Sequence, residues 1–379
     1  MKLKYAAAAG ALALATAVAL SACSSSGGSD DSSSSSSATP SGGPSIDSSL
    51  SGTITAGGSS AQANAEAAWT GAFTAVATGV TVNYDKSQGS GGGRSNFLSG
   101  AYDFAGSDAP LTADETTQAK TTCGADGAID LPIYLDGVSI SYNLDGVDKL
   151  NLSTKTLAKI FSRKITKWND AAIAADNPGV KLPSENITTV VRSDSSGTAN
   201  NFTNFLHASD PTDWKWEGSG TWPTDITGTD AQKGGSAVAD EIAKVPGAIG
   251  YVDNSAAKDS SGNDLQKATV NGVELTSDAV AKAMSDGATT ASNGSSGDLS
   301  LKFDYDKINA DSSAYPIPLV SYAIMCNQFK NADQAKLVKA YIGFAASATG
   351  QAVAEKNAKA VPLPQSILDQ VQTSLDAVK

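Results

Sequence analysis

The sequence of 379 residues is short of histidine, cysteine and positive charge. It has one histidine, three cysteines and a formal net charge of −12. This acidity excludes a broad cationic surface for nucleic acid or anionic lipid, so any anion must be held by local geometry. A single histidine, His207, and no closely spaced cysteine pair leave a zinc site without its usual ligands. We therefore expect no metal, no cofactor and no nucleic-acid partner.

The chain also lacks an apolar run long enough to cross a membrane near its start. The run from Ala6 to Leu20 follows Lys2 and Lys4 and is typical of a secretory signal. It ends in Leu-Ser-Ala-Cys at residues 20–23, which resembles the bacterial lipoprotein processing box. We predict a signal peptide over residues 1–22 and lipidation of Cys23. The alternative is an ordinary cleaved signal followed by an incidental cysteine.

A tether is predicted after Cys23, over residues 23–46. The stretch from Ser24 to Pro44 consists almost wholly of serine, glycine, aspartate, threonine and proline. Such a composition cannot bury a hydrophobic core. The sequence thus predicts a protein held by lipid at the extracytoplasmic face of the bacterial cell membrane, with no other membrane contact.

Two cysteines, Cys123 and Cys326, remain in the exported part of the chain. Thiols outside the cytoplasm tend to oxidise, so a disulfide between the two is one interpretation. The other is a pair of separately buried thiols, because sequence does not show whether two Cα atoms come within bridging distance.

From about residue 52 the chain alternates short β-rich runs with helical stretches. A chain of this length exceeds what one core usually supports, so two domains are expected. The alternation favours α/β layers with mostly parallel sheets. Strands are predicted over 52–56, 80–84, 102–106, 140–143, 187–191 and 248–252, helices over 62–78, 154–161, 199–207 and 237–244, and a surface loop over 286–297. Thr112 and Glu115 have capping-box spacing and predict a further helix start.

Glycine and hydroxyl residues occur at three places where a strand is followed by a helix: 57–60, 89–93 and 195–198. A helix start has unpaired N–H groups and positive partial charge, so each place is a candidate anion site. Each one alone is explained equally by a simple N-cap. No P-loop motif is present, and Arg94 stands where a dinucleotide fingerprint needs its third glycine.

Arg192 and Asp194 lie just before the third of these places. Arginine presents a planar fork of donors that suits two oxygens of one anion, whereas lysine offers a point charge. In extended chain the two side chains face the same way, so Asp194 can orient the guanidinium. The alternative is an ordinary surface ion pair.

Six motifs in series carry a family resemblance: residues 57–61 (GGSSA), 89–93 (GSGGG), 103–110 (DFAGSDAP), 164–169 (KITKWN), 192–198 (RSDSSGT) and 245–252 (VPGAIGYV). Together they resemble the PstS-type phosphate-binding proteins of bacterial phosphate ABC transporters over about residues 50–345. The resemblance implies a type II periplasmic-binding-protein fold, in which two α/β domains are joined by two crossover strands with the ligand cleft between them. It implies a first domain of residues 47–135 plus 318–379, a second of residues 136–317, and crossovers near Leu135–Val138 and Pro316–Val320.

The resemblance also implies which residues bind phosphate. They are Ser60, Ala61, Ser90, Asp108, Arg192, Ser196, Gly197 and Thr198, with Asp194 orienting the arginine. The chain departs from the family pattern at Ala61, where an aromatic residue is common, and at Gly91, where a second serine is common.

Asp108 is the residue that separates phosphate from similar anions. A carboxylate next to an anion is repelled unless the anion brings a proton to share, and phosphate near neutral pH carries one or two protons whereas sulfate carries none. The alternative is that Asp108 only caps the turn before Pro110.

The sequence thus predicts a non-enzymatic, monomeric binding protein that captures inorganic phosphate and delivers it to transmembrane permease subunits. The nearest alternative is a binding protein for another tetrahedral oxyanion, sulfate or molybdate. A hydrolase of phosphate esters would need an activated nucleophile or a metal pair, and neither is visible. A purely structural or adhesive lipoprotein would not need the arginine–aspartate pair or three glycine–hydroxyl helix starts.

Overall fold

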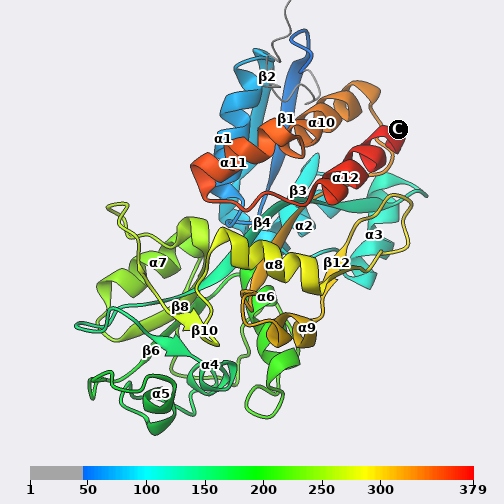
Figure 1. The fold of residues 1–379 in the computed structure, drawn as a ribbon. Helices are drawn as coiled ribbons and strands as arrows, with labels where there is room; N and C mark the ends of the chain where they lie inside the picture. The colour runs from blue at the N-terminus through cyan, green and yellow to red at the C-terminus, as the bar shows by residue number, and fades with distance from the viewer. Residues whose placement is uncertain (1–45) are drawn as a thin grey trace, which may run out of the picture. The chain divides into compact units, whose positions relative to one another are not determined.

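The computed structural model describes residues 46–379, so the predicted signal peptide, Cys23 and nearly all of the predicted tether lie outside the described residues. Its main element is a nine-stranded sheet in the order β2-β1-β3-β13-β4-β8-β6-β7, with β9 paired to β4 (Figure 1). The strands are β1 (Ser51–Gly58), β2 (Gly79–Asp85), β3 (Phe104–Ser107), β4 (Ala128–Tyr142), β6 (Thr188–Arg192), β7 (Asp230–Gln232), β8 (Ala248–Asp253), β9 (Gln266–Lys267) and β13 (Pro318–Cys326).

Helices and two small sheets surround this sheet. The small sheets pair β5 (Asn151–Leu152) with β10 (Thr269–Val270) and β11 (Ala288–Thr290) with β12 (Leu301–Phe303). No helix within residues 46–379 combines the length and the apolar character needed to span a bilayer. The α-helices are α1 (Ala63–Thr74), α2 (Gly89–Leu98), α3 (Ala113–Cys123), α4 (Thr154–Phe161), α5 (Ala171–Asp176), α6 (Gly197–Ser209), α7 (Gly235–Lys244), α8 (Ser277–Gly287), α9 (Tyr305–Ala310), α10 (Ala332–Ala345), α11 (Ala348–Ala358) and α12 (Gln365–Ala377), and the 3₁₀ turns are η1 (Lys86–Gln88) and η2 (Asn254–Ala256).

The main sheet is mixed, which corrects the prediction of mostly parallel sheets. Strand β1 pairs in parallel with β2 and β3, and β6 pairs in parallel with β7 and β8. Between these two parallel groups, β13 runs antiparallel to β3 and β4, and β4 runs antiparallel to β8. The alternation of strand and helix detects local crossovers only, whereas β4 and β13 are brought together from far apart in the chain.

Strands β4 and β13 lie where the crossovers were expected. Gly137 pairs with Pro318 and Leu135 with Val320, so the two predicted crossover segments are neighbours in the sheet. Every residue of β4 is buried. The predicted strand over residues 140–143 is therefore only the end of a much longer strand. The polar residues of β4 made it look unlike a buried strand in the sequence, so its full length was not predicted.

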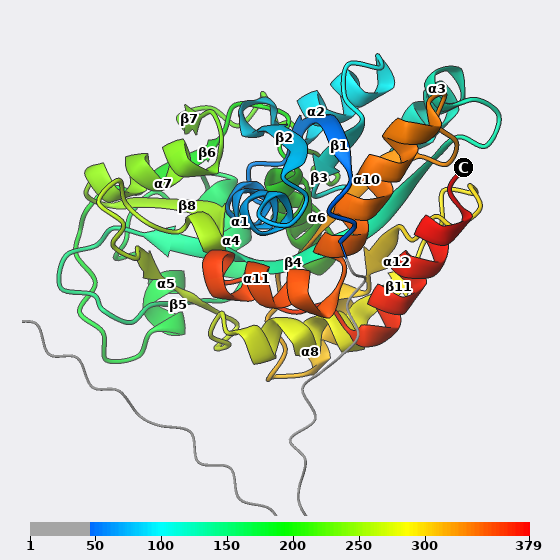
Figure 2. The ribbon, with the colours of Figure 1, turned by 90° about the horizontal axis from the view of Figure 1, so that it is seen from above.

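The beginning and the end of the described chain pack together. In Figures 1 and 2 the orange and red helices α10 and α11 lie beside the blue elements α1 and β1. The indole of Trp69 in α1 donates a hydrogen bond to the carbonyl of Gly350 in α11 (2.8 Å), and Gln334 in α10 donates to the carbonyl of Thr53 in β1 (3.1 Å). The C-terminal helices thus complete the layer around β1 to β3.

Local sequence signals account for several element boundaries. Helix α4 occupies the predicted residues 154–161 and is capped by Ser153, whose hydroxyl accepts from the N–H of Thr156. Helix α3 starts at the predicted capping box, in which Thr112 and Glu115 satisfy each other's backbone N–H groups. The loop predicted over 286–297 is partly wrong, because α8 ends at Gly287 and β11 covers Ala288–Thr290. The polar composition of residues 286–297 is typical of a loop, so the short strand β11 was not predicted.

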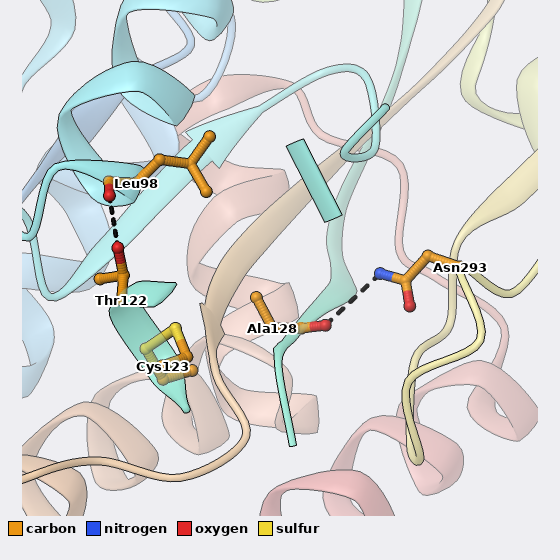
Figure 3. Close-up of a disulfide and its surroundings, with 6 residues drawn as sticks. Leu98, Thr122, Cys123, Ala128 and Asn293 are labelled. Atoms are coloured by element: carbon orange, nitrogen blue, oxygen red, sulfur yellow. Dashed lines mark hydrogen bonds between the residues drawn. A yellow bond between two sulfur atoms is a disulfide. The ribbon is translucent and has the colours of Figure 1, made fainter. Parts of the chain in front are cut away.

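A disulfide joins Cys123, the last residue of α3, to Cys326, the last residue of β13 (Figure 3). The Cα atoms are 5.1 Å apart although the residues are separated by 203 positions in sequence. Nearby, the hydroxyl of Thr122 donates to the carbonyl of Leu98 at the end of α2, which fixes α3 against that helix. The disulfide prediction is confirmed, and the bridge holds α3 to the middle of the sheet.

Candidate anion-binding site

The predicted helix starts come together with the turn that follows β3. The N–H of Gly91 in α2 donates to the carbonyl of Ser195 in the loop before α6 (3.0 Å). The N–H of Asp108 donates to the hydroxyl of Ser90 at the start of α2 (3.1 Å). Residues distant in the sequence thus lie side by side around Asp108.

Asp108 lies at the centre of this site and is buried, with 3% of its surface exposed. One carboxylate oxygen, Oδ1, accepts hydrogen bonds from the hydroxyls of Ser59 and Ser321, the second at 2.5 Å. The other, Oδ2, accepts from the hydroxyl of Thr198 at 3.3 Å. Burial raises the pKa of Asp108, while these hydroxyls and the charge of Arg192 partly oppose the rise. The carboxyl is thus held by neutral donors, and no basic residue within 46–379 is hydrogen-bonded to it.

The alternative role of Asp108, capping the turn before Pro110, is not what the structure shows. That turn is held by Ser107, whose hydroxyl accepts from the N–H of Ala109 at 3.3 Å. The carboxylate of Asp108 points instead towards hydroxyls in the loop before α1, on α6 and on β13.

Arg192 and Asp194 form a buried, bidentate ion pair. Nε of Arg192 donates to Oδ1 of Asp194 (2.8 Å) and Nη2 donates to Oδ2 (2.5 Å). Only 2% of the arginine side chain and 8% of the aspartate side chain are exposed, so the alternative of a surface pair is wrong. Among the described residues, Nη1 of Arg192 has no hydrogen-bond acceptor. One edge of the guanidinium is therefore used for orientation and the other can meet a ligand.

The arginine also determines the charge of its partner. Burial alone would raise the pKa of Asp194, but the hydrogen bonds and charge of Arg192 outweigh it and lower the pKa below its usual value. The backbone N–H of Gly234 adds a further bond to Asp194 (3.1 Å). Asp194 therefore stays ionised and neutralises the arginine.

Helix α6 starts directly against Asp108. Ser196 is the N-cap, and its hydroxyl accepts from the N–H of Ala199 (3.1 Å). A Cβ placed on Gly197 would stand 2.5 Å from both the Cβ of Asp108 and the hydroxyl of Ser90. Glycine is therefore required for this close approach. The hydroxyl of Ser196 accepts this capping bond and keeps its own O–H group as a donor.

Ser60 and Ala61 lie at the start of α1 but differ from each other. The N–H of Ala61 donates to the hydroxyl of Ser59 (3.0 Å), so in this structure it is engaged within its own turn. The hydroxyl of Ser60 accepts from the N–H of Gly235, the first residue of α7 (3.3 Å). Helix α7 thus supplies a fourth glycine-rich helix start at the site. Residues 233–236 (KGGS) have the same glycine–hydroxyl composition as the predicted starts and could have been found by it.

Ser59 and Ser321 are the residues that sequence reasoning missed around Asp108. Ser59 lies within the first motif, next to a predicted ligand, so its neighbourhood was visible. Ser321 lies in β13, 213 residues from Asp108, and its neighbours in sequence carry no local signal. Its hydroxyl also accepts from the side chain of Gln62 (2.7 Å), which fixes its orientation.

Ser60 also borders a hollow of about 510 Å³ on the surface. Three lysines line the hollow and take part in no ion pair among residues 46–379, although the chain as a whole is acidic. Its charged lining residues are Lys86, Lys233, Lys258, Asp240 and Asp259. The hollow is a positively biased approach to Ser60.

No group of three or more histidine, cysteine, aspartate or glutamate side chains in residues 46–379 is arranged to hold a metal ion. His207 lies in the last turn of α6, at the opposite end of that helix from Gly197. The residues that meet at Asp108 are thus hydroxyls, amides and one arginine, which suit the binding of an oxyanion.

Comparisons with known proteins agree with this chemistry. Residues 38–349 match the PBP superfamily domain. A phosphate-binding protein PstS 3 of Mycobacterium leprae is 35% identical over 84% of this chain and 85% of its own length. A phosphate-binding protein PstS of Xylella fastidiosa is 35% identical over 80% of this chain and 79% of its own length.

Solved structures support the fold. A phosphate-binding protein from Stenotrophomonas maltophilia has a TM-score of 0.66 at 22% identity, covering 85% of this chain and 94% of its own. A human phosphate-binding apolipoprotein has a TM-score of 0.67 at 24% identity, covering 84% of this chain and 93% of its own. The predicted fold, the type II periplasmic-binding-protein fold with two α/β domains, is thereby confirmed. The chain belongs to the PBP superfamily and, within it, to the family of PstS phosphate-binding proteins.

Proposed function

We propose that this protein binds inorganic phosphate outside the cytoplasm and delivers it to the transmembrane permease subunits of an ABC transporter. The observation that carries the proposal is the buried carboxylate of Asp108 among hydroxyls and helix starts. The proposed ligand contacts are the predicted ones: Ser60, Ala61, Ser90, Asp108, Arg192, Ser196, Gly197 and Thr198. The names of the relatives support the same ligand.

The charges of the site favour an anion that carries its own proton. Because Asp194 neutralises Arg192, the site has little positive charge beyond the partial charges of its helix starts. Asp108 adds a negative charge when it is ionised. Phosphate can place a proton between one of its oxygens and Asp108, whereas sulfate meets the carboxylate unprotonated. The site therefore discriminates by proton content rather than by total charge.

We also propose that residues 47–135 plus 318–379 and residues 136–317 act as two parts that close on the anion. Bonds between the two parts support this arrangement. The side chain of Asn201 donates to the carbonyl of Asp108 (2.6 Å), and Gly91 donates to Ser195 (3.0 Å). These bonds must break to admit the anion. Strands β4 and β13 are the proposed hinge.

The protein is proposed to act as a monomer, without enzymatic activity, while held to the membrane by lipid on Cys23. The Cys23→Ala variant tests the anchor, because it removes the only proposed attachment. A single acyl chain holds a protein only marginally, so more than one chain is expected. We expect the variant to leave the membrane fraction, and its retention at the wild-type level would contradict the anchor.

Isothermal titration of the exported part of the chain, freed of carried-over ligand by unfolding and refolding, tests the proposed ligand. We expect saturable binding of phosphate at one site and no measurable binding of sulfate or molybdate at the same concentrations. Tight binding of sulfate or molybdate would assign the protein to another tetrahedral oxyanion. The absence of binding by any of the three would contradict the proposed function.

A further inference from the structure

Asp253, the last residue of β8, is a second fully buried carboxyl near the anion site. Its Oδ2 accepts hydrogen bonds from the hydroxyl of Ser255 (2.6 Å) and the N–H of Ala256 (3.0 Å), which caps the turn η2. Its Oδ1 is buried and has no hydrogen-bond partner among the described residues. A buried carboxylate oxygen without a donor is unfavourable, so half of this side chain is left unexplained by the fold.

The unpartnered oxygen lies close to Ser60 and to the start of α7. The point where a Cβ on Gly235 would stand lies 3.1 Å from Oδ1 of Asp253 and 3.6 Å from the hydroxyl of Ser60. Gly235 begins α7, and its N–H donates to that same hydroxyl. Oδ1 thus borders the gap between the start of α7 and Ser60, a proposed phosphate contact.

Charged groups surround Asp253 from three neighbouring elements. Burial, together with the charge of Asp108 after β3, raises its pKa to about 6, although the hydrogen bonds within η2 and the charge of Arg192 on β6 act to lower it. From β4, burial and the charge of Asp253 raise the pKa of Asp136 to about 8. The other titratable groups on this side are Tyr134 on β4 and Lys267 on β9. The charge of Asp253 acts to raise the pKa of Tyr134, and the charge of Asp136 acts to raise the pKa of Lys267. In the described part of the chain, no basic group is hydrogen-bonded to Asp253.

We propose that Asp253 is a second carboxyl partner of the bound phosphate, which shares a proton with a phosphate oxygen through Oδ1 as Asp108 does from the other side. The proposal rests on the proposed function and deepens it. It gives the unpartnered oxygen a hydrogen bond, and it makes the site select phosphate that carries two protons in the complex.

The proton count distinguishes one carboxyl partner from two. With Asp108 alone, HPO₄²⁻ brings the one proton that must lie between carboxylate and phosphate, and binding changes no proton count. With both carboxylates ionised, the complex needs two protons. HPO₄²⁻ brings one and one more is taken from solvent, so the complex consists of H₂PO₄⁻ and two carboxylates, with one proton between the phosphate and each carboxylate.

The test is calorimetry of phosphate binding to the ligand-free protein at about pH 8, in two buffers that differ in ionisation enthalpy. We expect the wild type to take up about one proton per phosphate, and its dissociation constant to rise about tenfold per pH unit in this range. The Asp253→Asn variant donates to the phosphate from its amide and still caps η2, since asparagine is as good a cap as aspartate. It should bind with close to one proton fewer and a flatter pH profile.

Asp240→Asn is the matched control, because this carboxyl lies on α7 and lines the neighbouring hollow; its proton count should equal that of the wild type. Equal proton counts for the wild type and Asp253→Asn, with tight phosphate binding by both, would overturn this inference and leave the proposed function intact. Lack of phosphate binding by the wild type would instead overturn the proposed function. If Asp253→Asn does not fold, the wild-type count decides alone: one proton supports the inference and none refutes it.

Discussion

Asp108 and Asp194 are both buried carboxyls of the proposed site, yet they sit in opposite environments. Asp194, in the loop after β6, is bonded to a guanidinium and a backbone N–H, and its pKa is lowered. Asp108, in the turn after β3, is bonded to hydroxyls, and its pKa is raised.

The difference shows how one site divides two tasks between identical side chains. A carboxylate that only orients an arginine must stay charged, and a bidentate ion pair ensures this. A carboxylate that selects a protonated ligand by accepting its hydrogen bond must not already be neutralised by a cation. Hydroxyls suit that second task, because they stabilise the carboxylate and cannot discharge it.

The largest expected effect, on the rejection of sulfate, comes from removing the carboxylate of Asp108. A site built around one hydrogen bond can reject an analogue that lacks it by roughly 10⁴–10⁵. Asp108→Asn can donate as well as accept, so phosphate should still bind while rejection of sulfate falls by several of those decades. Competition of sulfate against labelled phosphate measures the change.

Asp103→Asn is the control for this prediction. Asp103 lies five residues earlier, and its carboxylate accepts from the N–H of Thr55 (2.7 Å), away from Asp108. This variant should keep the wild-type rejection of sulfate. Equal rejection by Asp108→Asn would place discrimination elsewhere.

The second effect concerns the ion pair on the other side of the site. Arg192→Met leaves Asp194 buried without its cation, and breaking a buried pair in this way costs about 3–5 kcal/mol. The pair of Lys215 and Asp225, with side chains 69% and 57% exposed, offers a contrast in Lys215→Met, which should cost less than about 1 kcal/mol. Denaturant unfolding of the ligand-free variants measures both, and equal losses would refute the comparison.

A smaller effect, on phosphate affinity, is expected for Arg192→Lys, which keeps the positive charge but loses the planar guanidinium. Lysine at position 192 cannot bond to both oxygens of Asp194 and also reach the anion. Losing one charge-assisted hydrogen bond costs about 1.5–3 kcal/mol, or roughly one to two decades in phosphate affinity. Arg163→Lys, in a residue that bonds to the carbonyl of Ile187, should leave affinity unchanged. An unaltered dissociation constant for Arg192→Lys would mean that the anion binds elsewhere.

The smallest effect concerns how stability depends on pH, which should change in opposite directions for Asp194 and Asp108. Asp194, with its lowered pKa, adds stability that is complete above the ordinary aspartate pKa and is lost as pH falls through the lowered value. Asp108, with its raised pKa, loses stability as pH rises from the ordinary pKa through the raised value. Melting temperatures of the ligand-free proteins should therefore show Asp194→Asn converging on the wild type towards acid pH, and Asp108→Asn gaining on it as pH rises. Parallel profiles would contradict the two environments.

Local chemistry made part of this structure predictable. The capping box before α3, the bounds of α4 and the pairing of Arg192 with Asp194 all depend on residues within a few positions of each other. The approach of α6 to Asp108 could be anticipated from Gly197, because only glycine permits such contact. The cysteine pairing was one of the two interpretations that the compartment and the small number of cysteines left open.

What could not be predicted depends on long-range packing. The antiparallel middle of the sheet arises because β4 and β13 meet across about half of the chain. Ser321 reaches Asp108 only through that meeting, and Asp253 reaches the site only because β8 lies beside β6. Ser321 has no neighbour in sequence that indicates its role, and Asp253 follows directly on the motif at residues 245–252 without belonging to it.

The bonds from Gly91 to Ser195 and from Asn201 to Asp108 involve no atom of the anion. In the closing motion proposed above, they stabilise the shut arrangement whether or not phosphate is inside, and they set how often the empty protein is open. The apparent affinity is the intrinsic affinity reduced by the fraction of molecules able to admit the ligand. Weakening these contacts therefore raises the rate at which phosphate is captured and also the rate at which it is lost. A protein that captures phosphate faster thus holds it for a shorter time before transfer.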